Sequence, residues 1–337
     1  MSRGMRLAFF GLGTALFVWL VAQIGVRQLR ADALATGWMI VPIVLLYGLV
    51  HGCSAGALQL VLHDERGRPG LARTWAIVVA GTAINFITPI VNAGGEPYKV
   101  AELGPALGAA RAAGAVILHA ILRLLGFLLV WLTALILGLL LLRRTPMTLA
   151  LLAGGIVVVG ALIALLVGGH RRRPLERTLD LVHRVPGLRR LAGRLDARRP
   201  AIVATDAQIA EFHRRHPRRF ALAVALEYAG RCLFMLEFCL IGLSIGTRVR
   251  YLDAFVVGGL EALVTNLLFF VPFELGTRES ATYLLFRQLG YGGGIGLYAA
   301  LVSRLRDFLW IGAGLLLIWA GHRRRPATRP AEGSTPA

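Results

Sequence analysis

The sequence predicts an all-α protein, a polytopic membrane helix bundle, and three observations support this prediction. Hydrophobic residues make up 56% of the 337 residues and charged residues only 16%, and mean hydropathy is +0.67. Several apolar runs exceed the ~18 residues that mark a membrane span. The chain also matches itself weakly at one fixed offset. We therefore expect residues 1–337 to form a single integral membrane domain without a soluble catalytic domain.

Eight apolar segments, separated by polar turns, follow one another along the chain. They cover residues 7–26, 38–62, 74–91, 106–142, 147–169, 219–246, 254–272 and 292–320. The first is not followed by a small-residue cleavage site, so we expect a membrane span rather than a signal peptide. Polar, Gly/Pro-rich turns follow 74–91 and 254–272. If each of these two is half of a re-entrant hairpin, six full spans remain, and otherwise there are eight.

The basic residues lie mainly between the apolar segments. The formal net charge is +19, and the polar stretch 170–219 alone holds fourteen arginines. With six spans, the loops on one side carry 23 basic residues and those on the other side carry 6. The positive-inside rule then places the 170–219 loop and both termini in the cytoplasm of a bacterial inner membrane. This loop either lies on anionic lipid as amphipathic helices or only fixes the orientation. We expect no nucleic-acid partner.

The internal match appears at an offset of 181 residues. It aligns Tyr47 with Tyr228, Asn85 with Asn266, Gly95 with Gly276, Arg123 with Arg304 and Phe127 with Phe308. With six spans, the first copy begins outside and the second begins inside, which predicts inverted repeats of the kind common in secondary transporters. Repeat 1 covers 38–142 and repeat 2 covers 219–320, each with a re-entrant helical hairpin. Residues 143–218 supply a linker span and the basic loop, and 321–337 a disordered basic tail.

Each repeat contains one segment in which the helix is broken. The first copy contains Asn85, Pro89, Gly94, Gly95, Glu96, Pro97 and Lys99, and the second contains Asn266, Pro272, Gly276, Thr277, Arg278 and Glu279. Proline breaks the helix, glycine permits a tight reversal, and irregular backbone at membrane depth requires protein or a wet cavity around it. We expect a new helix to begin at Pro97 with Glu96 as its cap, and Thr277 to cap the second copy. A helix N-terminus that faces a cavity suits a phosphate. The alternative is a kinked helix that ends at a surface loop.

Charged residues also lie inside the apolar spans that follow each break. His119 and Arg123 share one helix face, and Arg304, Arg306 and Asp307 stand at the matching place. A charge at the bilayer centre costs at least ~2.5–3.5 kcal/mol, so it should be paired or line a cavity. We predict the ion pairs Glu96–Arg123 and Glu279–Arg304, and a Glu227–Arg231 pair at i,i+4 spacing. Two alternatives are that the pairs only hold helices together, and that Arg304 and Arg306 reach an interface.

The two broken segments together resemble the lysylphosphatidylglycerol synthase transmembrane family, which is flippase-like. The resemblance rests on Asn85, Pro89, Gly94, Gly95, Glu96 and Pro97 in one copy and on Pro272, Leu275, Gly276, Arg278 and Glu279 in the other. It covers about residues 7–320 and implies movement of a lipid between leaflets. Larger members carry an aminoacyl-transferase domain after the membrane part, and we expect that activity to be absent. Stand-alone relatives are tied to other lipids, such as hopanoids or polyprenyl-linked sugars. Phe273 and Glu274 stand where relatives are often Gly-rich, which leaves the headgroup open.

We predict a flippase that moves a lipid with an anionic or zwitterionic headgroup. The predicted substrate site consists of Asn85, Pro89, Gly95, Glu96, Lys99, Arg123, Asn266, Pro272, Gly276, Arg278, Glu279 and Arg304. Glu96 and Glu279 would bind cationic groups or protons, and Arg123, Arg278 and Arg304 would hold the phosphate. Walker, HExxH, GxSxG and paired Cys/His motifs are missing, so we expect no enzyme, cofactor or metal.

Two other functions stay open. The chain is either a non-catalytic membrane partner of a separate lipid- or glycan-modifying enzyme, or an intramembrane transferase that uses Glu96 or Glu279 as a base. A lipid-biosynthetic enzyme and a second copy of the chain are the protein partners to consider.

Overall fold

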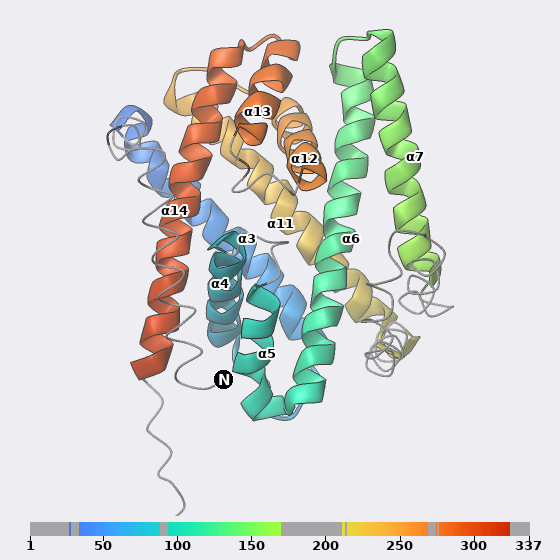
Figure 1. The fold of residues 1–337 in the computed structure, drawn as a ribbon, viewed down its shortest axis with the longest axis vertical. Helices are drawn as coiled ribbons and strands as arrows, with labels where there is room; N and C mark the ends of the chain where they lie inside the picture. Colours follow the sequence, from blue (N-terminus) through green and yellow to red (C-terminus); the bar gives the residue numbers. More distant parts are fainter. Residues whose placement is uncertain are drawn as a thin grey trace, which may run out of the picture.

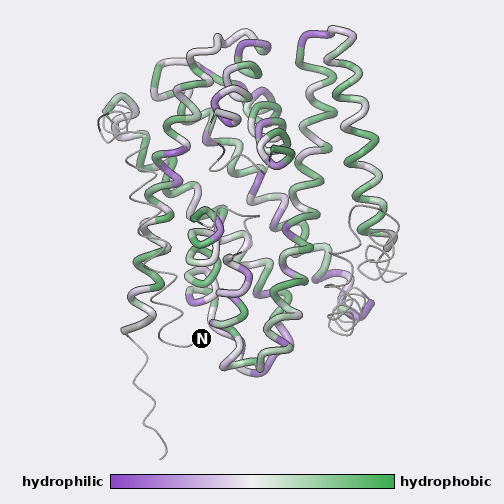
Figure 2. The backbone as a smooth tube through the Cα atoms, in the orientation of Figure 1, coloured by the Kyte–Doolittle hydropathy of each residue, from purple (hydrophilic) through white to green (hydrophobic). Residues whose placement is uncertain are grey.

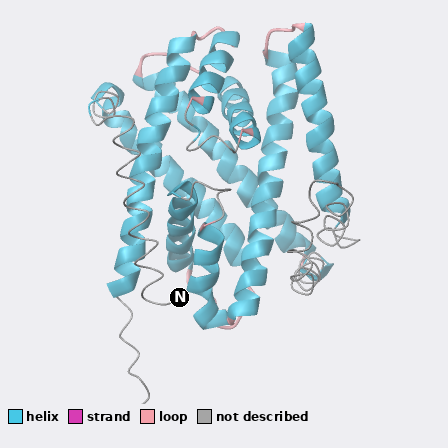
Figure 3. Ribbon diagram, in the orientation of Figure 1, coloured by secondary structure: helices cyan, strands magenta, loops and turns pink. Residues whose placement is uncertain are grey.

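The fold consists of helices joined by short connections. The computed structural model describes residues 27, 34–87, 94–169, 211–212, 214–268, 274 and 276–323. Helices cover nearly all of these residues, and this part of the chain contains no strand (Figure 3). The predicted all-α class is confirmed.

Long helices form the frame of the bundle (Figure 1). They are α3 (Ile40–Val61), α6 (Ala109–Leu141), α7 (Pro146–Gly169), α11 (Pro217–Ser244) and α14 (Gly293–Arg323), and a 3-10 turn, η1 (Gly37–Met39), precedes α3. Their bounds agree with predicted apolar segments to within a few residues; segment 7–26 lies outside the described residues. By length and composition, three helices of the described chain can cross a membrane, namely Leu34–Val61, Ala109–Leu141 and Pro146–Val167. Helices α11 and α14 are as long but carry charged residues in their middle.

Four shorter helices form two pairs inside this frame. They are α4 (Leu71–Ile87) with α5 (Gly95–Leu107), and α12 (Tyr251–Leu267) with α13 (Thr277–Gln288). At 1.5 Å per residue, the 12 residues of α13 extend about 18 Å, well short of the ~30 Å hydrocarbon core. In Figure 1, α4 and α5 lie in the lower half and α12 and α13 in the upper half. The connections at 88–93 and 269–273 lie outside the described residues, as do the predicted Pro89 and Pro272.

Each short pair packs against a long helix from the other half of the sequence. Helix α4 contacts α14 through an apolar cluster that includes Ala80, Ile84, Phe308 and Ile311. Helix α12 contacts α6 through a second cluster that includes Val130, Ala134, Val256 and Leu260. The two halves of the chain are therefore packed into one bundle.

Gly48, Gly52 and Gly56 recur at every fourth position of α3, a spacing of small residues that predicts close helix packing. A Cβ atom added at Gly56 would lie 3.3 Å from Leu226 of α11, and one at Gly48 would lie 3.2 Å from the ring of Trp310 of α14. Gly52 has open space around it. Close packing of α3 is thus confirmed at two of the three glycines.

The outer surface of the bundle is apolar. Val157 on α7 is 70% exposed and Leu45 on α3 is 65% exposed. Figure 2 shows hydrophobic residues along most of α6 and α7, with hydrophilic residues at the connections and at mid-height in the interior. Such a distribution suits hydrocarbon outside the bundle and polar chemistry within it.

Candidate functional site

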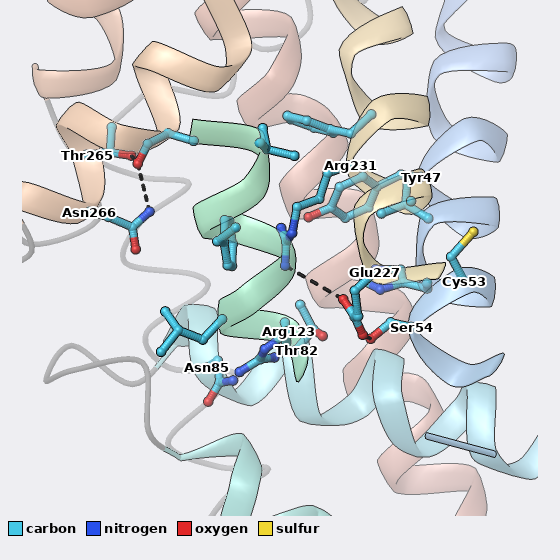
Figure 4. Close-up of a pocket in the computed structure, with 18 of the residues that line it drawn as sticks. Tyr47, Cys53, Ser54, Thr82, Asn85, Arg123, Glu227, Arg231, Thr265 and Asn266 are labelled. Carbon is cyan, nitrogen blue, oxygen red and sulfur yellow. Dashed lines mark hydrogen bonds and ion pairs between the residues drawn. The ribbon is translucent and has the colours of Figure 1, made fainter. Parts of the chain in front are cut away.

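A cavity of about 430 Å³ lies in the middle of the bundle. Its walls come from α3, α4, α6, α11, α12 and the start of α13 (Figure 4). The polar side chains that line it are Tyr47, His51, Ser54, Thr82, Asn85, Arg123, Glu227, Arg231, Glu261, Thr265, Asn266, Glu274 and Arg278. Its volume falls within the usual range of small-molecule sites, but its lining is unusually rich in charge.

Asn85 fixes the beginning of α5. Its Oδ1 accepts a hydrogen bond of 2.6 Å from the backbone N–H of Gly95. The helix begins at Gly95, so the predicted start at Pro97 with Glu96 as cap is wrong. The reason is that a side chain from the neighbouring α4 satisfies the free N–H group. Gly95 permits this approach, because a Cβ atom there would lie 2.8 Å from the carbonyl carbon of Gly81.

Glu96 faces two cations. Arg123 of α6 donates a hydrogen bond of 2.7 Å from Nη2 to Oε1 of Glu96, which confirms the first predicted ion pair. The ammonium of Lys99, the only lysine in the chain, lies 3.7 Å from the same oxygen. Lys99 is 1% exposed, whereas Glu96 and Arg123 are each 25% exposed. The carboxylate thus compensates a buried lysine and a partly exposed arginine.

Glu279 performs a matching role in the second short pair. Its Oε1 accepts a 2.5 Å hydrogen bond from Nε of Arg304 on α14, which confirms the second predicted ion pair. Its Oε2 accepts a 2.9 Å hydrogen bond from the N–H of Gly276. Gly276 has a φ of 81°, a left-handed backbone conformation that favours glycine. Thr277 is the first helical residue rather than the predicted cap, and its hydroxyl donates to the carbonyl of Glu274 at 3.0 Å.

Arg278 is surrounded by three carboxylates. Its Nη2 donates to Glu274 at 2.6 Å and its Nη1 to Asp307 of α14 at 2.7 Å. Its Nε lies 3.3 Å from Oε1 of Glu261 on α12. These contacts connect α13 to both α12 and α14, and they leave the charge of Arg278 fully compensated.

Arg306 lies deeper in the same region. It donates to Glu237 of α11, and to Asp307 at 2.7 Å. Its guanidinium carbon lies 4.1 Å from the centroid of the Tyr47 ring. Arg304 and Arg306 are 5% and 1% exposed, so the alternative that they reach an interface is wrong. Their carboxylate partners inside the bundle offset the cost of burial.

The opposite wall of the cavity centres on Glu227 and Arg231 of α11 (Figure 4). Glu227 accepts a 2.7 Å hydrogen bond from Ser54 of α3 and lies 3.1 Å from the ring nitrogen of His119 on α6. Arg231 lies 3.8 Å from Glu227, which confirms the predicted i,i+4 pair. The guanidinium carbon of Arg231 lies 3.1 Å from the centroid of the Phe127 ring. Among the described residues, Glu227 is the one carboxylate that contacts Arg231, and this contact is long. The Phe127 ring therefore contributes much of the stabilisation of the Arg231 charge, through a cation–π interaction.

The predicted site residues divide into those that line the cavity and those that do not. Asn85, Arg123, Asn266 and Arg278 line the cavity. The lining does not include Gly95, Glu96, Lys99, Gly276, Glu279 and Arg304. Of these, Glu96 binds the lining Arg123, and Glu279 binds the N–H of Gly276 at the start of α13. Glu261 was not among the predicted site residues, although a glutamate inside the apolar segment 254–272 indicates a functional position in a membrane span.

An apolar helix bundle with a charged interior cavity defines a polytopic membrane protein. The chain belongs to the family described as the lysylphosphatidylglycerol synthase TM region, whose model matches residues 6–314. This match covers nearly the whole chain and both broken segments. No curated protein and no solved structure matches the chain.

Proposed function

We propose that the protein is a flippase, which moves a phospholipid or another lipid with a polar headgroup between the leaflets of a bacterial inner membrane. The observation that carries this proposal is the charged cavity between the two short helix pairs. Three arginines and three glutamates line it, Arg123, Arg231, Arg278, Glu227, Glu261 and Glu274. Charges at membrane depth mark substrate pathways more often than architecture, and a wet cavity lowers their cost. Membership of a lipid-related membrane family agrees with this function.

An inverted repeat supports a transport mechanism. The chain contains the helix order α3, α4, α5, α6 and then the corresponding order α11, α12, α13, α14. When 181 is added to the residue number at which each helix of the first set begins, the result agrees with the start of its counterpart to within a few residues. In Figure 1, α3 descends while α11 ascends, and the short pairs lie in opposite halves. We infer that each short pair is a re-entrant hairpin and that the repeats are inverted. Rocking of one repeat against the other would open the cavity to each side in turn.

The positions of the connections support six full spans with both termini in the cytoplasm. The connections at 142–145, 245–250 and 289–292 lie at the upper end in Figure 1, and those at 62–70 and 108 lie at the lower end. The lower end is also where α7 ends and α11 begins, on either side of the arginine-rich stretch 170–216. The positive-inside rule assigns this lower end to the cytoplasm.

Arg231 and Arg123 are the residues we assign to the phosphate of the headgroup. Among the described residues, the one carboxylate that contacts Arg231 is Glu227 at 3.8 Å, and its buried Nε has no hydrogen-bond partner there. Arg278, by contrast, already contacts three carboxylates. A guanidinium that stacks on a ring and retains free donors suits bidentate phosphate binding. We therefore revise the predicted phosphate ligands: Arg231 joins Arg123, and Arg278 and Arg304 stabilise the site.

Lipid movement in proteoliposomes tests the function. The purified protein is reconstituted with a fluorescent phospholipid, and the label in the outer leaflet is quenched chemically over time. The wild type should accelerate exchange between leaflets, and Arg231→Gln should slow it at least tenfold, as expected when about 1.4 kcal/mol or more of binding is lost. Arg218→Gln is the matched control, since this exposed arginine lies on the same helix.

The same preparation separates the alternatives. Mass spectrometry of the recovered lipid would reveal a chemical change if the protein were a transferase. If the wild type moves no lipid of any headgroup charge until a second enzyme is added, the partner function is correct and the flippase proposal fails.

A further inference from the structure

More carboxylates than cations lie around the upper end of the cavity. We name as the upper cluster Glu237, Glu261, Glu274, Arg278, Glu279, Arg304, Arg306 and Asp307. Ion pairs connect six of them, and the Glu279–Arg304 pair joins these six through a hydrogen bond from Arg304 to the backbone carbonyl of Glu274. Five carboxylates thus face three guanidinium groups. A buried excess of negative charge is unfavourable, so the cluster favours the uptake of a proton.

Glu261 is the member of the upper cluster with the weakest compensation. Its side chain is 7% exposed, and its buried Oε1 has no hydrogen-bond partner in the part of the chain that the structure describes. The nearest cation is Arg278, whose Nε lies 3.3 Å from Oε1 of Glu261. The other two nitrogens of Arg278 donate hydrogen bonds to Glu274 and Asp307, whereas Nε makes no hydrogen bond within the described chain. Glu261 lines the cavity, so a proton can reach it.

The other carboxylates of the upper cluster are better compensated. Ser303 and Arg306 bind the two oxygens of Glu237. Two arginines bind Asp307, and Arg304 and a backbone N–H bind Glu279. Glu274 is 30% exposed and forms a 2.6 Å pair with Arg278. Glu261 is therefore the group at which an added proton removes the largest penalty.

Charged groups of both signs surround Glu261. Arg278 of α13 lies 3.3 Å from it, and Glu274, which precedes α13, and Arg306 and Asp307 of α14 belong to the same cluster. Tyr47 and His51 of α3 and Arg231 of α11 line the same cavity. Helix α6 contacts α12 through apolar side chains, including Val130 and Ala134.

We propose that Glu261 is the proton-binding group of this transporter, so that a proton gradient drives lipid movement. The inference rests on the proposed flippase function. On one side, an O–H bond of a hydronium ion breaks as its proton forms an O–H bond to the Glu261 carboxylate, and water is left behind. On the other side, that carboxyl O–H bond breaks as a water molecule accepts the proton and becomes a hydronium ion. Protonation removes one negative charge from the wall opposite Arg231, so it favours a bound phosphate. Proton and anionic headgroup therefore move in the same direction.

Exchange of a fluorescent phosphatidylglycerol under a pH gradient tests the coupling. With the donor side more acidic, wild-type transport from that side should rise by up to about tenfold per pH unit, as expected for one bound proton. A sodium gradient at equal pH should have no effect. Glu261→Gln should reduce the ratio of the rates with and without the pH gradient to one, and the control Glu65→Gln on a connecting loop should keep the wild-type ratio. A Glu261→Gln protein that still responds to the pH gradient would overturn the proposal.

Infrared spectroscopy in detergent detects the proton without any transport. The wild type should show the C=O band of a protonated carboxyl group, shifted in D₂O, that disappears in Glu261→Gln and persists in Glu261→Asp and Glu65→Gln. If the band is absent, or survives in Glu261→Gln, Glu261 does not bind the proton. If the band behaves as expected but the wild type moves no lipid, the flippase function fails while the proton site stands.

Discussion

Arg123 in the middle of α6 donates a 2.7 Å hydrogen bond to Glu96 at the start of α5, and both side chains remain 25% exposed. The Arg306–Glu237 pair between α14 and α11 differs sharply, since its side chains are only 2% and 1% exposed. Water can screen a charge left behind in the first pair but not in the second. The two pairs therefore provide a matched test of transport against architecture.

Glu96→Gln should impair transport and leave the fold intact. Arg123 keeps contact with water, so the loss of its partner should lower the free energy of unfolding by about 1 kcal/mol or less. The buried Lys99 also loses its nearby carboxylate, which brings the total loss to about 1–3 kcal/mol, below that of a fully buried pair. Lipid exchange in proteoliposomes should fall strongly, because Glu96 positions Arg123 at the cavity. Thermal melting in detergent is measured on the same preparation. A stable Glu96→Gln protein with wild-type exchange would remove Glu96 from the site.

Glu237→Gln should destabilise the protein. Arg306 then lies in a dry interior with one carboxylate partner fewer, and breaking a buried pair typically costs about 3–5 kcal/mol. The double variant Glu237→Gln with Arg306→Met should recover part of that loss, since it removes the buried arginine that has lost one of its two carboxylate partners. Melting temperature and yield in detergent report the effect. If Glu237→Gln melts like the wild type, water reaches this pair.

The ion pairs divide into those that the sequence predicts and those that it does not. Glu96–Arg123 and Glu279–Arg304 were predictable, because each glutamate follows a helix break and each arginine recurs at the offset of 181 residues. Arg306–Glu237 was not, since the partners are 69 residues apart and no periodicity selects one carboxylate among several. Such choices depend on how long helices cross, which local pattern does not encode.

Helix starts were the weakest part of the sequence prediction. Local rules placed Glu96 and Thr277 as caps, but α5 is capped by Asn85 from another helix. A cap contributed by tertiary contact leaves no signature in the residues around the helix start. The bounds of the long helices were predictable because long, predominantly apolar segments bounded by polar turns mark them, even where a few charged residues interrupt the segment.

Gly95→Ala should disrupt the contact between α4 and α5. Its Cβ atom would lie 2.8 Å from a backbone carbon of Gly81, and backbone cannot move aside as a side chain can. Overpacking of this kind costs about 1–3 kcal/mol. Gly104→Ala on the same helix has open space and should be neutral or stabilise by about 0.5–1 kcal/mol. Equal melting temperatures for the two variants would contradict the close approach of α4 and α5.

Glu274 should tolerate glycine better than alanine. Its φ is 56°, a left-handed conformation that costs a non-glycine residue about 1–2 kcal/mol. Both variants lose the 2.6 Å pair with Arg278, but only Glu274→Gly relieves the backbone strain. Glu274→Gly should therefore be more stable than Glu274→Ala by about 1 kcal/mol in thermal or denaturant unfolding. The reverse order would show that Glu274 is not held in this conformation.

The orientation can be tested with single cysteines on opposite ends of the bundle. Arg66 and Arg144 are exposed on the lower and upper connections, and the native cysteines Cys53, Cys232 and Cys239 are first replaced by alanine. In intact cells, a membrane-impermeant thiol reagent should label Arg144→Cys, whereas Arg66→Cys should react only after lysis. This follows because the connection that holds Arg66 lies at the same end as the arginine-rich stretch, which the positive-inside rule keeps in the cytoplasm. The opposite labelling pattern would invert the protein in the membrane. Labelling of both positions from one side would place the two connections on the same face and would remove the basis for six spans and inverted repeats.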